Sequence, residues 1–314
     1  LTGYRINATN LTYYFDSAKH DTTNKQFSSF YGNTVITGQS GAAGENELDD
    51  LLNMIFLKDE VAEFICKKLY RFFVYYDIDS NTDTNVIQPL AAIFRNNNYD
   101  IVPVLSALFK SEHFFDELNR GCVIKSPVDY FIGGCREFNA VFPASTDVVQ
   151  QYYFWYVIEA LCSSTTQDIG DPPNVAGWPA YYQSPGYHEM WINSDTLPKR
   201  TQFFDLLINT GYSHQGLTLL FNVLDFTAAL SDPGDPNVVI NESLALLYSI
   251  DTDTNLFNYL KSILLSGQAT DNYWTSAWLD YVNAPTNQTY VGIVKSRLNQ
   301  MFQYLIDLAE YQLS

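Results

Sequence analysis

The 314-residue sequence has few charged residues, and basic residues are scarcest of all. Charged residues make up 17% of the chain, and 17 lysines and arginines stand against 35 aspartates and glutamates, which gives a formal net charge of -18. A field of that sign repels phosphate backbones and anionic lipid surfaces. We therefore expect neither nucleic acid nor an anionic membrane as a partner.

Several motifs that identify enzyme classes are also missing. The sequence contains no G-x-S-x-G, P-loop or G-x-G-x-x-G motif. It therefore does not support the interpretation of this chain as a serine hydrolase or as a nucleotide-binding protein. Its cysteines form no C-x-x-C pair and its histidines no H-x-x-x-H pair, so a zinc site is not expected. Apolar helical patterns indicate buried thiols at Cys66 and Cys162, whereas Cys122 and Cys135 could pair in an oxidising compartment.

Long apolar runs are absent too. No stretch is long enough to span a bilayer, and the opening residues, LTGYRINATN, lack the basic and apolar regions of a signal peptide. Aromatic residues are abundant instead, with 23 tyrosines and 21 phenylalanines. They supply core, and also surfaces suited to sugars or protein partners.

Helical periodicity dominates the chain from Glu45 onward. Short β-prone runs at 12–15 and 33–36 precede it and predict a small β-hairpin or extended arm. Later helices are expected at 86–94, 101–109, 127–138, 147–162, 194–209, 216–230, 238–248, 254–265, 271–282 and 290–311. The sequence therefore predicts a mainly α, multi-helical bundle with a long Pro/Trp-rich central loop.

Composition divides the chain into four parts. Residues 1–44 read as a β or extended arm with a Gly-rich loop, 45–166 as a helical subdomain, 167–204 as the Pro/Trp-rich loop and 205–314 as a C-terminal helical subdomain. We expect them to pack as one compact domain.

Oxygen-bearing side chains alternate in the stretch YDIDSNTDTN, at Asp77, Asp79, Asn81, Asp83 and Asn85. Calcium loops use this spacing. An EF-hand would have glycine where Thr82 stands and glutamate where Gln88 stands. The stretch is therefore either a solvated turn between helices or a Ca²⁺ site, and no other cofactor is predicted.

His20 lies beside Asp21 and shortly before Lys25. A histidine next to a carboxylate can serve as a general base or a metal ligand, which makes these three residues candidates for polar chemistry. The alternative is a surface turn in which His20 makes a local hydrogen bond.

The segment 167–204 carries five of the 12 prolines and two of the five tryptophans. A loop of this length without a period of its own is uncommon and usually functional. Its candidate ligand-binding residues are Asn174, Trp178, Trp191 and Asn193. The alternative is that the two tryptophans pin the loop to the helical core.

Several segments, in order, resemble the bacterial family known as domain of unknown function (DUF) 1800. LTGYRI is similar to the family's LTGW-type segment, and KHDTTNKQFSSFYG to its HD-x-G-x-K-x-F-x-G stretch. ELDDLLNMIFLKDEVAEFICKKLYRFFV, IKSPVDYFIGGCREF and DIGDPPNVAGWP followed by WINSDTL resemble its E-L-D, K-S-P-V and P-P-N-V-x-G-W segments. The similarity covers residues 1–205 and weakens beyond them. Two departures are Thr22, where the family has glycine, and the expanded loop at 76–85.

The resemblance implies the C-terminal portion of the family domain, in an exported bacterial protein of the periplasm or cell surface. Members often come from organisms that degrade or display polysaccharide. They are often encoded near sulfatase-like proteins, so an association with such proteins is implied. The family brings no settled activity with it.

Two functions follow from these features. The first is a binding or assembly module for a glycan or a protein at the cell envelope, favoured by the aromatic residues and the missing catalytic motifs. The alternative is a hydrolase-like enzyme whose site is completed by an N-terminal region absent from this chain. In that enzyme the His20 segment would meet basic residues at family-like polar positions, namely Arg71, Lys125 and Arg136. Those three serve equally well as surface or ion-pairing residues of helices, and whether the protein is an enzyme stays open.

Overall fold

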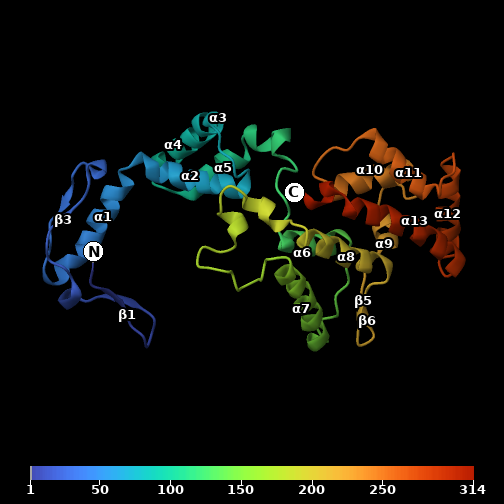
Figure 1. Ribbon diagram of the computed structural model, residues 1–314, viewed down its shortest axis with the longest axis horizontal. Coiled ribbons are helices and arrows are strands. Elements are labelled where there is room, and N and C mark those ends of the chain that lie inside the picture. The colour runs from blue at the N-terminus through green and yellow to red at the C-terminus, as the bar shows by residue number, and fades with distance from the viewer. Residues whose placement is uncertain (1) are drawn as a thin grey trace. The chain divides into compact units, whose positions relative to one another are not determined.

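The computed structural model describes residues 2–314 and is mainly α-helical, as predicted (Figure 1). The chain divides into an N-terminal unit, Leu1–Phe114, and a C-terminal unit, Phe115–Ser314. This division falls inside the segment 45–166 that the sequence treats as one part. None of the helices in residues 2–314 has the length and apolar character that crossing a membrane requires.

Two short hairpins open the N-terminal unit, where the sequence predicts one small hairpin or an extended arm; the β-prone runs at 12–15 and 33–36 each pair with another strand. Strand β1 (Tyr4–Ile6) pairs antiparallel with β2 (Tyr13–Phe15), and β3 (Lys25–Gln26) pairs antiparallel with β4 (Val35–Ile36). A 3₁₀ helix, η3 (Gly41–Glu45), then leads directly into the first α-helix.

The remaining elements of this unit are α1 (Asn46–Phe56), α2 (Asp59–Phe73), α3 (Ser80–Thr82), the π-helical turn η4 (Asp83–Ile87), α4 (Gln88–Asn96) and α5 (Ile101–Phe109). Lys58, with φ -91° and ψ 132°, separates α1 from α2, and Asp59 and Glu60 occupy the first turn of α2, where the helix dipole favours acidic residues.

The expected loop at 76–85 is partly wrong. The side chain of Asp79 accepts a hydrogen bond from the Thr82 amide at 2.7 Å and so starts a helix at Ser80. The core of the unit lies between α2, α4 and α5, where Cys66, Ile87 and Leu108 are fully buried.

The C-terminal unit contains the longer helices, namely α6 (Pro127–Glu137), α7 (Val148–Ser164), α8 (Thr196–Asn209), α9 (Val223–Ala228), α10 (Pro236–Leu247), α11 (Thr254–Leu264), α12 (Asn272–Asn283) and α13 (Gln288–Asp307). Local caps fix several of their starts. Ser126 accepts from the Asp129 amide ahead of Pro127, and Asp253 accepts from the Leu256 amide.

Helix α13 runs through the core of this unit. Its apolar positions are fully buried at Val294, Leu298, Met301, Phe302 and Leu305. Aromatic rings from other helices pack around them, and Phe138 stacks on Phe221 with centroids 4.8 Å apart. These positions form one buried apolar stripe along the helix.

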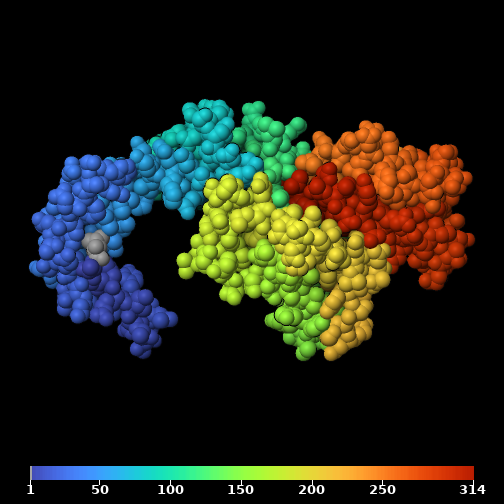
Figure 2. All heavy atoms as spheres, viewed as in Figure 1, coloured from blue at the N-terminus to red at the C-terminus, as the bar shows by residue number. Residues whose placement is uncertain are grey.

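The predicted helix at 216–230 is wrong in its first part. Residues Tyr212–His214 (β5) and Leu217–Leu219 (β6) form an antiparallel hairpin, and the helix begins only at Val223. The turn residues Gln215 and Gly216 both have positive φ, which a two-residue hairpin loop requires. The hairpin lies beside α7 (Figure 2), because the His214 ring stacks on Tyr153 at 3.6 Å.

The predicted buried thiols are confirmed, since Cys66 and Cys162 are free and fully buried. Cys135 is also a free, buried thiol, so the alternative of a Cys122–Cys135 disulfide is not realised.

A buried arginine joins the two ends of the C-terminal unit. Arg200 on α8 is fully buried and donates to the Lys125 carbonyl oxygen and, at 3.1 Å, to Gln312 Oε1. The Lys125 amide in turn donates to the Gln312 carbonyl oxygen at 2.8 Å. The last residues of the chain are thereby fastened to the start of α6.

Candidate functional site

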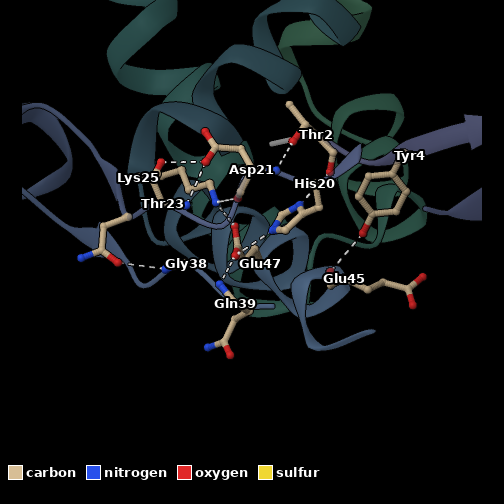
Figure 3. Close-up of polar contacts among 11 residues, drawn as sticks. Thr2, Tyr4, His20, Asp21, Thr23, Lys25, Gly38, Gln39, Glu45 and Glu47 are labelled. Carbon is tan, nitrogen blue, oxygen red and sulfur yellow. Dashed lines mark hydrogen bonds and ion pairs between the residues drawn. The ribbon is translucent and has the colours of Figure 1, made fainter. Parts of the chain in front are cut away.

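A buried polar network in the N-terminal unit unites two of the residues predicted from the sequence (Figure 3). His20 Nε2 lies 3.0 Å from Glu47 Oε1, and Lys25 Nζ lies 2.7 Å from Glu47 Oε2. The Gln39 amide donates to Glu47 Oε1 at 2.6 Å. The side chains of Glu47 and His20 are 0% and 1% exposed. Glu47, at the start of α1, is therefore the centre of the network.

The geometry sets the charge on His20. Its Nδ1 lies 2.9 Å from the Thr2 carbonyl oxygen while Nε2 faces the Glu47 carboxylate, so both ring nitrogens meet acceptors. Both nitrogens can donate only in the imidazolium form. Accordingly, the pKa of His20 is raised, first by the hydrogen bond to Thr2 and then by Glu47. Burial alone raises the pKa of Glu47, but Lys25 and His20 outweigh it and bring the pKa to about 2.

Two glycines of the GQSGAAG loop allow this close packing. A Cβ on Gly44 would lie 2.6 Å from His20 Cδ2, and one on Gly38 would lie 2.1 Å from the Thr22 carbonyl oxygen. Only glycine fits at such distances. The Gly-rich loop and the acidic first turn after it were the signals in the sequence, but local spacing cannot show that Glu47 folds back onto His20.

The other candidates around His20 have separate partners. The Asp21 carboxylate accepts from the Thr23 amide and hydroxyl, both at 2.8 Å, which lowers the pKa of Asp21, and Lys25 donates to the Asp21 carbonyl oxygen. Arg71 is exposed on α2 and its Nε donates to the Tyr76 carbonyl oxygen at 3.2 Å.

Lys125 and Arg136 belong to the C-terminal unit. Lys125 Nζ lies 4.0 Å from Glu137 Oε1 and 4.1 Å from the centre of the Tyr311 ring, and burial lowers the pKa of this lysine. Arg136 is exposed at a cavity described below. The joint catalytic role of these residues with His20 stays a prediction.

In the predicted calcium stretch, Asp79 caps α3 and Asp83 Oδ1 lies 2.7 Å from Lys67 Nζ. The side-chain Nδ2 of Asn85 donates to Asn81 Oδ1 at 2.8 Å. Across residues 2–314, no group of three or more histidine, cysteine, aspartate or glutamate side chains is arranged to hold a metal ion. To bind calcium, the carboxylates of Asp79 and Asp83 would need to leave these partners and converge with Asp77.

Calcium binding at 77–85 stays a prediction with a direct test. A ligand that binds only the folded state, at a hundred times its Kd, adds about 2.7 kcal/mol to stability. If the site exists, calcium should raise the melting temperature, and Asp79→Asn together with Asp83→Asn should abolish the rise. If calcium left the melting temperature of the wild-type protein unchanged, the predicted calcium site would be ruled out.

The Pro/Trp-rich segment forms a cavity of about 470 Å³ within the C-terminal unit. Its aromatic and apolar walls come from Trp178 and Trp191 and from Pro173, Pro179 and Met190. Two 3₁₀ helices, η7 (Pro179–Tyr181) and η8 (Tyr187–Trp191), shape this wall. The Tyr181 ring stands edge-on to both indoles, with centroids 6.5 Å from Trp178 and 5.6 Å from Trp191.

Polar groups also face this cavity, namely Ser163, Thr166, Asp168 and Asp171. Ser163 Oγ donates to Asp168 Oδ2 at 3.2 Å. Trp178 Nε1 is buried and has no hydrogen-bond partner within the described residues. A buried N–H without an acceptor is costly, so this donor still lacks the acceptor that it needs.

The four predicted ligand-binding residues separate into two pairs. Trp178 and Trp191 line the cavity, although Trp191 is only 3% exposed and also anchors the loop, as the alternative expected. Asn174 donates to the Tyr182 hydroxyl at 2.7 Å and accepts from the Ala176 amide. Asn193 accepts from the Thr196 amide at 2.9 Å. The two asparagines therefore shape the loop, and the carboxylates at 168 and 171 were missed because many acidic residues in the sequence look alike.

These features define a mainly helical protein with a buried ion network in one unit and an aromatic-lined cavity in the other. The family model described as "Protein of unknown function (DUF1800)" matches residues 1–313. The chain belongs to this family, and the resemblance seen in its motifs is confirmed. No curated protein and no solved structure is significantly similar to it.

Proposed function

We propose that this protein is a binding module of the bacterial cell envelope and that the cavity of the Pro/Trp-rich segment holds a saccharide. The observation that carries the proposal is the pairing of the Trp178 and Trp191 indoles with hydroxyl and carboxylate groups around about 470 Å³. Sugar rings present apolar C–H faces to aromatic rings and hydroxyls to polar groups, and Trp supplies both an apolar face and an N–H donor. The volume is within the range of small-ligand sites.

The charge of the lining narrows the choice of saccharide. Asp168 and Asp171 face the cavity, and its lining residues include neither lysine nor arginine. Carboxylates accept hydrogen bonds from sugar hydroxyls or pair with an amine, but they repel a uronate or a sulfate. A neutral or amine-bearing saccharide is therefore the favoured class.

Location at the envelope is supported by the family resemblance, and it makes a polysaccharide the natural partner. An envelope protein is the second partner class under the same proposal, and an association with sulfatase-like proteins stays a prediction. The hydrolase alternative has no comparable support, because both ring nitrogens of His20 are occupied and its side chain is 1% exposed.

The test is calorimetric titration with matched neutral, amine-bearing and uronate trisaccharides. We expect the neutral or amine-bearing probes to bind, and Trp178→Ala to weaken that binding by at least about tenfold, the loss of one stacking contact and one hydrogen bond. Tyr156→Ala is the matched control, since Tyr156 is 64% exposed on α7 and does not line the cavity. Binding of the uronate alone, no saccharide binding, or equal effects of the two substitutions would contradict the proposal.

A further inference from the structure

A second, larger cavity lies between α6 and α7 of the C-terminal unit. Its volume is about 600 Å³, and it is separate from the aromatic cavity in its lining residues. Most of its wall is apolar, including Ile132 from α6, Trp155 and Ile158 from α7, and Phe142 and Ile169 from the adjoining loops. Pockets of this size and character are typical of small-molecule sites.

The rim of this cavity exposes large apolar side chains to water. Trp155 is 46% exposed and Ile169 is 47% exposed. Helix α7 buries Phe154, Ile158 and Cys162 along one face, so its core packing is complete without Trp155. Covering such side chains removes apolar surface from water and releases roughly 25 cal/mol per Å². The rim is therefore suited to the apolar body of a ligand.

Polar groups gather at the same rim. Arg136 lies in the last turn of α6 and Asn139 lies two residues after the end of that helix, and both are exposed. The described residues provide no ion pair and no hydrogen bond to the Arg136 guanidinium. Arginine in this state presents a fork of N–H donors that matches a carboxylate or a phosphate.

We propose that this cavity binds a small amphiphile with an apolar body and one anionic head group. The body lies against Phe142, Trp155 and Ile158, and the head accepts hydrogen bonds from Arg136 and Asn139. A medium-chain fatty acid is the simplest molecule of this class. The site shares no lining residue with the saccharide cavity.

Glu159 is the one acidic residue in the lining and decides between head groups. Burial, followed by the charge and hydrogen bond of Asp168, raises the pKa of Glu159. In its protonated form Glu159 donates a hydrogen bond to an anionic head, whereas its carboxylate would favour a cationic one. Amphiphiles that differ only in the head group separate these cases.

The experiment titrates the protein with decanoate, decanol and decylammonium below their micelle concentrations, by calorimetry and by tryptophan fluorescence. We expect decanoate to bind tightest. Arg136→Gln should weaken decanoate by about tenfold or more, the value of a charge-assisted hydrogen bond, and decanol by less than about threefold. Ala140→Phe, which fills the cavity, should abolish binding of both.

Arg120→Gln is the control, because it removes the same charge from an exposed arginine that does not line the cavity. Arg136→Gln alters no core contact, so the unfolding curve of this variant should match that of the wild type. A matching curve shows that any loss of decanoate binding does not come from unfolding. Absence of decanoate binding, tighter binding of decylammonium, or equal losses in Arg136→Gln and Arg120→Gln would each overturn the proposal. Loss of saccharide binding in Trp178→Ala leaves these results unchanged.

Discussion

Glu47→Gln is expected to lower the free energy of local unfolding across residues 2–57 by about 3 kcal/mol, the cost of removing one partner from a buried ion pair. The amide keeps the size of the side chain but leaves the charges of His20 and Lys25 unbalanced in a site where Glu47 is 0% exposed. Amide hydrogen exchange on peptides from this segment should show protection falling by about a hundredfold.

Glu45→Gln is the matched control, because Glu45 is exposed two positions earlier and Tyr4 binds its carbonyl oxygen, not its carboxylate. It should leave protection unchanged. Tryptophan fluorescence provides a second control, since all five tryptophans lie in the C-terminal unit. Equal protection in Glu47→Gln and wild type would show that the network does not hold the segment together.

The pH dependence of amide protection in residues 2–57 should reflect the shifted pKa values of Glu47 and His20. The pKa of Glu47 is depressed from 4.5 to about 2, so its contribution is complete above 4.5 and is lost as pH falls towards 2. The pKa of His20 is raised above 6.5, so its contribution is complete below 6.5 and is lost as pH rises through the raised value. Protection in the wild type, corrected for intrinsic exchange, should therefore peak between 4.5 and 6.5, and Glu47→Gln should flatten the profile.

Arg200→Ala is expected to destabilise the C-terminal unit by about 4 kcal/mol. It leaves a cavity in the core and removes the donors for the Lys125 carbonyl, which lies in a part-buried position, and for Oε1 of the buried Gln312. The guanidinium also lies 4.7 Å from the centre of the Tyr130 ring, and that contact is lost as well. Denaturant unfolding followed by tryptophan fluorescence measures the change.

Two variants separate the causes of this loss. Arg200→Met keeps most of the volume and should cost about half as much, because only the hydrogen bonds and the ring contact disappear. Lys199→Ala removes a partly exposed ion pair with Asp195 and should change stability by less than about 1 kcal/mol. If Arg200→Ala lowered the free energy of unfolding no more than Lys199→Ala, the buried hydrogen bonds of Arg200 would not contribute to the stability of the unit.

Much of the helical fold could be predicted because its signals are local. Ser126 before Pro127 and Asp253 before α11 each cap a helix through the amide three residues further on, so the chain nearby contains all that is needed. The buried stripe of α13 repeats within a single helix. The hairpin at 212–219 was missed because its strands are short and its packing partner, Tyr153, lies far back in the sequence.

The candidate sites could be predicted less completely, because they depend on contacts that local sequence patterns do not reveal. The Trp-rich segment and the His20 segment stood out by composition, and the structure gives each a defined environment. Glu47 and Asp168 could not be identified from the sequence. An acidic residue in the first turn of a helix or in a loop is common, and its neighbours in the sequence do not indicate which side chain it will contact. Both depend on contacts between residues that are distant in the chain or separated by a turn.

The sequence by itself determined that the chain is a mainly helical, acidic member of the DUF1800 family, because helix periodicity, caps and motif order are all properties of neighbouring residues. Tertiary structure alone decided that both ring nitrogens of His20 face acceptors, that Arg200 links Gln312 to the start of α6, and that two cavities flank α7. Charge state, burial and cavity shape arise only when distant segments exclude water from the space between them.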